Sequence, residues 1–225
     1  MKKVLSLFLA AMMIIGLTAC GSTTNTGTAS GSASGSDAAS VDYSVVTEDT
    51  AAKTVKIFAE VNGKYFTEVT RHGVVFAKGS NGEKSILRAL CSEKDFYQGM
   101  IDIGGVPGDN LSLPCDNGAV IEGDKLGITV SWDGSNGEIP FENCVKTGSG
   151  EPYQMDARFG GNIKHAYAAN TGCIFCLDSC PVGITSNAAY GFGVVEKDKT
   201  EQFYGNPDVL PEDGTLVTVT FTLEA

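Results

Sequence analysis

A chain of 225 residues with 27 acidic and 16 basic side chains carries a formal net charge of −11 at neutral pH. That charge disfavours nucleic acids and anionic lipid headgroups as partners, so we expect no nucleic-acid binding. The chain holds two histidines against seven cysteines. Common acid–base and zinc-hydrolase designs, which depend on histidine, are therefore thinly supplied, and we expect no enzyme of these types.

The first twenty residues have the layout of a bacterial export signal. Lys2 and Lys3 precede an apolar stretch at 4–16, and Leu17-Thr18-Ala19-Cys20 follows it. The stretch is too short for a stable transmembrane span, and the last four residues resemble a bacterial lipobox. We expect a signal peptide at 1–19 and a lipidated Cys20 that carries diacylglycerol and a palmitate-type acyl chain. The alternative is an ordinary secretory signal cut at the same place.

Such a signal predicts a protein anchored by lipid to the cell membrane, on its extracytoplasmic face. Of the twenty residues in Gly21 to Ser40, fourteen are Gly, Ser or Thr, a composition that cannot bury enough apolar surface to order itself. We therefore assign 20–52 to a lipid-anchored flexible linker. The remaining 53–225, roughly 170 residues, fit one globular domain.

Three segments of this domain have the alternating pattern of half-buried strands. In the first, 55–61, apolar residues alternate with Lys56, Phe58 and Glu60, and Asn62-Gly63 comes next. Because Asn-Gly favours the tight turns of hairpins, we expect a hairpin with a second strand at 64–70. The segments 127–132 and 217–223 predict two further strands, the last with a threonine face toward water.

One helix is clear from its capping pattern. Ser92 is an N-cap candidate, Asp95 lies in the first turn, and apolar residues recur at helical spacing up to Ile103, where Gly104-Gly105 ends the helix. The segment 83–90 is a candidate for a second short helix. These elements predict an α+β fold: a single domain built on an antiparallel sheet with one or two short helices.

Cys173, Cys176 and Cys180 form the sharpest chemical signal. Their C-x2-C-x3-C-P spacing is the last three-quarters of the bacterial ferredoxin run, whose first cysteine falls here on Asn170. A fourth ligand for a 4Fe-4S cluster or for zinc would come from elsewhere in the chain. The candidates for this additional donor are Cys91, Cys115, Cys144 and His165.

Three interpretations of these cysteines stay open. An oxidising exterior favours structural disulfides or buried thiols, which we rank first. Metal or iron–sulfur binding comes second, and a catalytic redox dithiol comes third. Outside the run, a single histidine such as His72 is more often a surface or hydrogen-bonded residue than a catalyst. Asp178, inside the run, is expected to cap a turn or to orient a ligand.

Two blocks of sequence together resemble the YdjY family of exported bacterial proteins. The first runs from Arg71-His72-Gly73 to Gly108-Asp109-Asn110. The second runs from Phe159-Gly160-Gly161-Asn162 through the cysteine run to Ser186-Asn187-Ala188-Ala189-Tyr190. The family is uncharacterised, and its members are sometimes described as iron–sulfur or ferredoxin-like proteins.

Together these observations predict an extracytoplasmic lipoprotein with a binding or accessory role, whose partner is a protein or a small molecule. The alternative is an iron–sulfur or zinc protein with a redox or electron-transfer role that uses the same cysteines.

Overall fold

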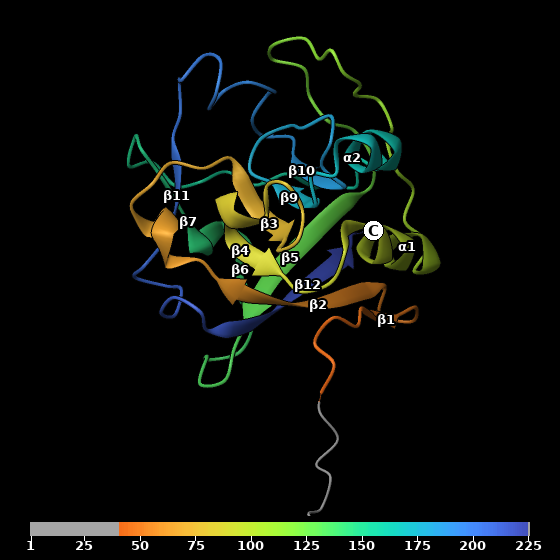
Figure 1. The fold of residues 1–225 in the computed structure, drawn as a ribbon, viewed down its shortest axis with the longest axis vertical. Helices are drawn as coiled ribbons and strands as arrows, with labels where there is room; N and C mark the ends of the chain where they lie inside the picture. Colours follow the sequence, from red (N-terminus) through yellow and green to blue (C-terminus); the bar gives the residue numbers. More distant parts are fainter. Residues whose placement is uncertain (1–40, 225) are drawn as a thin grey trace, which may run out of the picture. The chain divides into compact units, whose positions relative to one another are not determined.

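A computed structural model describes residues 41–224 of the chain. Ten strands form one sheet, in which eight strands follow one another until the last pairs with the first (Figure 1). In spatial order these eight are β2 (Thr54–Val61), β12 (Leu216–Leu223), β5 (Lys125–Ser131), β8 (Ala157–Arg158), β10 (Thr185–Asn187), β9 (Cys173–Cys176), β3 (His72–Phe76) and β4 (Ser85–Ala89). The pairing of β4 with β2 closes the sheet.

Short strands and helices complete the domain. β1 (Thr47–Asp49) pairs with β2, and β6 (Ile139–Pro140) pairs with β5. β7 (Val145–Thr147) and β11 (Phe203–Gly205) form a separate two-stranded sheet. The helices are α1 (Glu93–Asp102), α2 (Ile163–Ala169) and the 3-10 turns η1 (Gly63–Phe66), η2 (Gly82–Lys84) and η3 (Phe141–Cys144).

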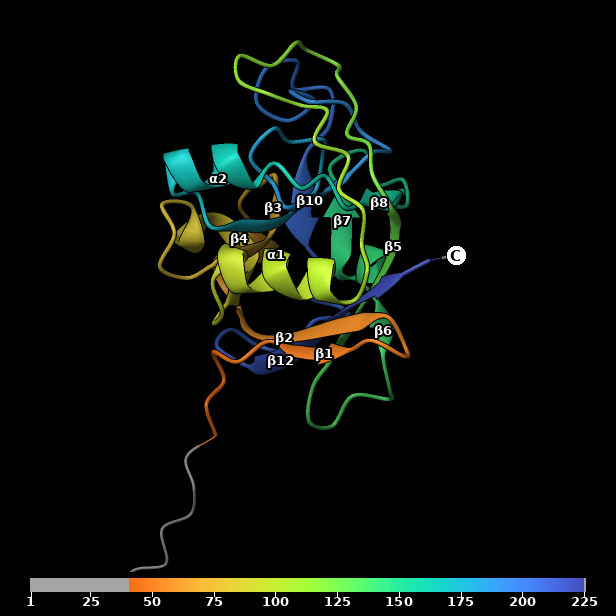
Figure 2. The same cartoon turned by 90° about the vertical axis from the view of Figure 1, so that its right-hand side faces the viewer.

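The predicted α+β class is confirmed. Most neighbouring strands are antiparallel, whereas β3–β4 and β9–β10 are parallel pairs. Both α-helices lie on the same side of the sheet in two perpendicular views (Figure 2). They contact each other where the Lys94 ammonium lies 3.7 Å from the centre of the Tyr167 ring.

The predicted strands at 55–61 and 217–223 are the centre of the core. Val55, Ile57, Ala59 and Val61 are buried on β2, and the alternating apolar residues of β12 are buried opposite them. α1 adds Phe96, whose ring lies 4.6 Å from that of Phe221, centre to centre. Each large apolar side chain buried here contributes about 1.5–3 kcal/mol.

The predicted cap of α1 is confirmed, because the Ser92 hydroxyl accepts a hydrogen bond from the Asp95 backbone N–H at 3.2 Å. The helix predicted at 83–90 is wrong. Residues 82–84 form η2 and 85–89 form β4, which is bonded on both sides, to β2 and β3. A strand that is buried on both faces has no alternation, so its apolar run does not distinguish it from a buried helix.

The hairpin predicted at Asn62-Gly63 is also wrong. Asn62 has φ −112°, and the chain continues into η1 instead of turning into a strand at 64–70. The Gly63 N–H donates to an Asp213 carboxylate oxygen at 2.8 Å, and a Cβ on Gly63 would lie 2.9 Å from the Asp213 Cβ. A contact 150 residues away thus replaces the local turn.

The linker predicted at 20–52 lies partly inside the described residues. Its segment 47–49 is β1, so this part pairs with the sheet. The predicted signal peptide at 1–19, the lipidation site Cys20 and the tether at 21–40 lie outside the described residues. Within 41–224, none of the helices has the length and apolar character that crossing a bilayer requires.

Candidate metal centre

Two irregularities between β3 and β9 bring Cys173 and Cys176 onto one face. In a regular strand, residues three apart point to opposite faces. Here Cys176 lies opposite His72 and Cys173 opposite Val75, because the pairing passes over Gly73 on β3 and Ile174 on β9. Such bulges re-aim side chains. Both thiols therefore reach a small buried cluster with Val75 and Cys180, separate from the main core.

Gly73 is required at its position by packing. A Cβ there would lie 2.8 Å from the Phe175 ring and 3.1 Å from Leu177, both in the core. The absence of a side chain lets β3 approach β9 at the bulge, and this approach places His72 beside the cysteines.

Three donor atoms meet at this point. The ligand atoms of His72, Cys173 and Cys176 all lie within 4.8 Å of one another, and all three residues are buried. His72 Nδ1 lies 3.7 Å from Cys173 Sγ, and the Asn81 side-chain amide donates to the same sulfur at 3.7 Å. In the part of the chain that the structure describes, this is the one group of three such residues with metal-ligand geometry.

The three groups set opposite pKa shifts on the two thiols. Hydrogen bonding from Cys176, followed by His72 and Asn81, holds the pKa of Cys173 well below its usual value despite burial. The same contact with Cys173, together with Cys180 and burial, raises the pKa of Cys176 well above its usual value. The two shifts therefore favour a thiolate on Cys173 and a protonated thiol on Cys176.

Cys180 lies on a turn that folds back over this cluster. It is 2% exposed and packs in the same buried cluster as Cys176. The Asn162 side-chain amide holds the turn by donating to the carbonyls of Cys180 at 3.1 Å and Gly183 at 3.3 Å. Asn162, at φ 47° in the left-handed conformation, thus anchors the cysteine loop.

A buried ion pair lies beside the sulfur atoms. Arg71 donates from Nε and Nη2 to one oxygen of Asp178 at 2.9 and 2.7 Å, and from Nη2 to the Ser179 carbonyl at 3.1 Å. Burial raises the pKa of Asp178 to about 6 although Arg71 opposes the shift. Asp178 thus pairs with Arg71 instead of capping a turn, and its second oxygen has no hydrogen-bond partner within 41–224.

The other predicted donors lie outside the group formed by His72, Cys173 and Cys176. Cys91 follows β4, Cys144 ends η3, and burial raises the pKa of each thiol to about 12. Cys115 is half-buried in the loop between α1 and β5, and His165 lies on α2 beside a different pocket. None of them belongs to the three-donor group, and none of the six cysteines in residues 41–224 is in a disulfide.

His72 is the donor that sequence reasoning missed. It is separated from Cys173 by 101 residues, and only the pairing of β3 with β9 brings the two together. The signal in the sequence was its neighbour Gly73 in the first family-like block, because a glycine inside a strand often marks a bulge or a close approach.

These features define a class: an α+β domain with a closed mixed sheet and a buried histidine–cysteine cluster. Residues 46–222 match the YdjY domain family. The chain is 44% identical over 170 residues to the uncharacterized protein YdjY of Escherichia coli (strain K12), covering 76% of this chain and 75% of that protein. The chain therefore belongs to the YdjY domain family, as its motifs predicted. No solved structure matches it.

Proposed function

We propose that this domain binds a single thiophilic metal ion, with Zn²⁺ as the first candidate. The observation that carries the proposal is the convergence of His72, Cys173 and Cys176 within 4.8 Å in a buried position. Cys180, which is buried in the same cluster as Cys173 and Cys176, is the fourth candidate donor. Three cysteines and one histidine are a common zinc ligand set.

The distances suit a single ion. With Zn–S bonds of about 2.3 Å and Zn–N bonds of about 2.0 Å, neighbouring donors on a tetrahedral ion lie about 3.5–3.8 Å apart. The 3.7 Å between His72 Nδ1 and Cys173 Sγ fits this value. The thiols of Cys173 and Cys176 are both free and lie in the same group of donors.

The same distances favour one ion over a 4Fe-4S cluster. In a cluster each thiolate binds a different iron, so the ligand sulfurs lie farther apart than around one ion. The position of the missing first cysteine supports this choice. Asn170 there ends α2 in the left-handed conformation, and its carbonyl accepts a hydrogen bond from Ser80.

The surroundings suit a bound cation. The Ser186 hydroxyl is buried and has no hydrogen-bond partner among the described residues, and Ser186 pairs with Cys176 across β9 and β10. A Cβ on Gly183 would lie 2.7 Å from this hydroxyl and 3.1 Å from Cys176 Sγ, so both groups border the same small space. A hydroxyl in this space is one of the polar groups that commonly surround metal ligands. The Arg71 guanidinium offsets part of the thiolate charge.

We further propose that the protein binds its metal at the cell envelope. The lipobox-like sequence before Cys20 supports a lipoprotein on the extracytoplasmic face of the membrane. A metal ion there would protect the thiols, because bound thiolates are not free to oxidise. We assign no catalytic step to the site.

The test is metal analysis of the full chain purified without oxygen, combined with free-thiol counting on the same sample. We expect one zinc per chain in the natural protein and loss of most of it in His72→Ala and Cys173→Ser. The matched control is Cys144→Ser, which removes a buried thiol outside the cluster. Several irons per chain with broad visible absorption, or full zinc retention in both cluster variants, would contradict the proposal.

A further inference from the structure

A pocket of about 280 Å³ opens beside the proposed metal centre. Its lining includes His72, Arg71 and Lys84 together with the apolar side chains of Val69 and Val195. Cys173 and Cys176 are fully buried, whereas His72 is 9% exposed and lines this pocket. Among the proposed ligands, His72 is thus the one through which a bound molecule can contact the metal centre.

The imidazole of His72 has one nitrogen to offer this pocket. Nδ1 lies against Cys173 Sγ, so Nε2 is the ring nitrogen left for the pocket that His72 lines. When Nδ1 binds a metal, Nε2 carries the ring proton and becomes a donor. Metal-binding histidines almost always give this second N–H to a carboxylate, a carbonyl or water. Water or a molecule bound in the pocket can take this place, and a carboxylate is one such acceptor.

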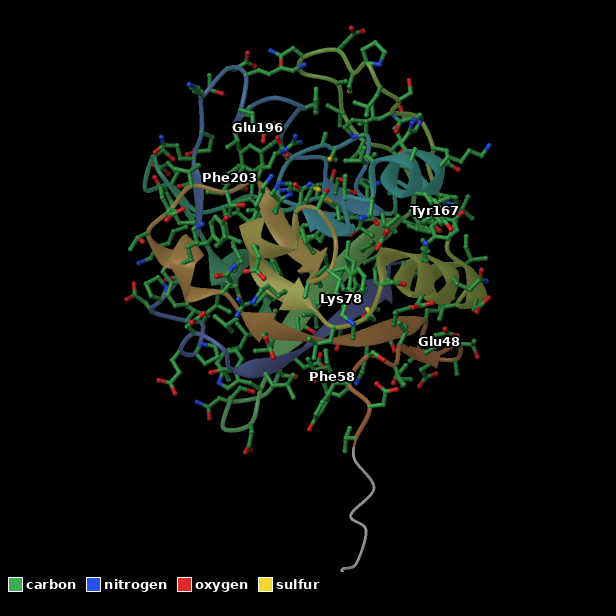
Figure 3. The ribbon with its side chains drawn as sticks, viewed as in Figure 1. Glu48, Phe58, Lys78, Tyr167, Glu196 and Phe203 are labelled. Atoms are coloured by element: carbon green, nitrogen blue, oxygen red, sulfur yellow. The ribbon has the colours of Figure 1, made fainter. Side chains whose placement is uncertain are left out.

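The charges around the pocket favour an anion at this point. The exposed Lys84 ammonium donates to Asn81, the residue that in turn donates to Cys173. Glu196 lies at the rim, on the segment after β10 (Figure 3), with its carboxylate 3.5 Å from Arg71 and 63% exposed. Its negative charge disfavours a dianion more than a monoanion.

We propose that the pocket binds a small monocarboxylate with a short apolar chain, which accepts a hydrogen bond from His72 Nε2 and lies near Lys84. The chain of such a molecule packs between Val69 and Val195. This inference rests on the proposed function, because a metal on Nδ1 is what fixes the proton on Nε2.

The experiment uses the zinc-loaded full chain labelled with ¹⁵N-histidine, titrated with acetate, butyrate and inorganic phosphate. The chain has two histidines, and His165 lies beside a different pocket, so its imidazole signals are an internal control. We expect a saturable shift of the His72 Nε2–H signal, with butyrate binding about fifteenfold more tightly than acetate because each of its two additional methylenes favours binding roughly fourfold when buried.

Lys84→Met should weaken butyrate binding severalfold and leave the zinc content unchanged, whereas the control Lys125→Met on β5 should change neither. Glu196→Gln should strengthen binding, since it removes a competing carboxylate. Equal shifts at both histidines, tighter binding of phosphate, no saturable response, or an unchanged affinity in Lys84→Met would each overturn this inference. A chain that binds no zinc overturns the proposed function as well, which separates the two failures.

Discussion

At the scale of single residues, His72 and the thiols of the proposed site differ in their access to solvent. The thiols are sealed from solvent, and the imidazole is the donor that the surface pocket reaches. The environment also separates the cysteines into two kinds. Those of the cluster have polar partners, whereas Cys91 and Cys144 have pKa values raised mainly by burial. The second kind behaves as small apolar residues.

This division predicts how the thiols react with iodoacetamide in the folded, metal-free chain at pH 8. Thiolate is the reacting species, and a pKa of about 12 for Cys91 and Cys144 in place of 9.0 leaves about a thousandfold less of it. We expect the half-buried Cys115 to be alkylated first and these two last. Mass spectrometry of timed digests measures the order, and unfolded chain, in which all thiols react alike, is the control. If Cys91 were alkylated as fast as Cys115, the Cys91 side chain would not stay buried in the folded chain in solution.

At the scale of elements, the strands that could be predicted were those with one buried face. Along β2 and β12, apolar residues alternate with polar or less buried ones because the second face of each strand is more exposed. β4 could not be recognised, since it is covered on both faces. The turn at Asn62-Gly63 failed for another reason: Asp213, from the other end of the domain, fixes Gly63 in a non-hairpin conformation. Local propensity was overridden by a tertiary contact in that case.

The candidate site was predictable only in the part that depends on residues close together in the sequence. Cys173, Cys176 and Cys180 are close in sequence, so their spacing alone indicated a cluster. The donor that joins them comes from β3, and its position depends on a bulge that no periodic pattern reveals. Sequence reasoning chose His165 because it is near in the chain, whereas the sheet brings His72 near in space.

The bulge predicts the effect of Gly73→Ala. The new Cβ would lie 2.8 Å from the Phe175 ring, which packs edge-on against Phe141 with ring centres 5.2 Å apart. We expect a loss of about 1–3 kcal/mol in the free energy of unfolding, as for other overpacked cores, and weaker zinc binding because β3 is displaced from β9.

Denaturant unfolding and zinc titration of the full chain measure the two effects. The control is Gly127→Ala on β5, where the nearest atom to a new Cβ is the end of the flexible Glu224 side chain at 3.4 Å. Equal stability of the two variants would show that the close approach at Gly73 does not constrain the sheet.

At the scale of the whole molecule, the proposed location and the proposed site constrain each other. Outside the cytoplasm, unprotected thiols tend to oxidise. Five of the six cysteines in the described part of the chain are buried, and three of these form the cluster around which we propose the metal. An exported protein with this arrangement is expected to acquire its metal after folding, because the chain crosses the membrane unfolded and the donors come from β3 and β9, far apart in sequence.

The proposed location at the membrane can be tested with Cys20→Ala in the full chain, expressed in a bacterial host. If the thiol of Cys20 carries the lipid, this variant cannot be acylated, and two acyl chains are what hold such a protein stably on a bilayer. We expect it in the soluble extracytoplasmic fraction or as an unprocessed precursor, while Cys144→Ala, which also removes one thiol, stays with the membrane. Fractionation with immunoblotting measures the distribution, and intact mass reports the lipid. Because the proposed metal ligands are other residues, the released variant should bind zinc as the natural protein does. Membrane retention of Cys20→Ala at the natural level would remove the anchor from the proposal and leave the metal centre to be judged by its own test.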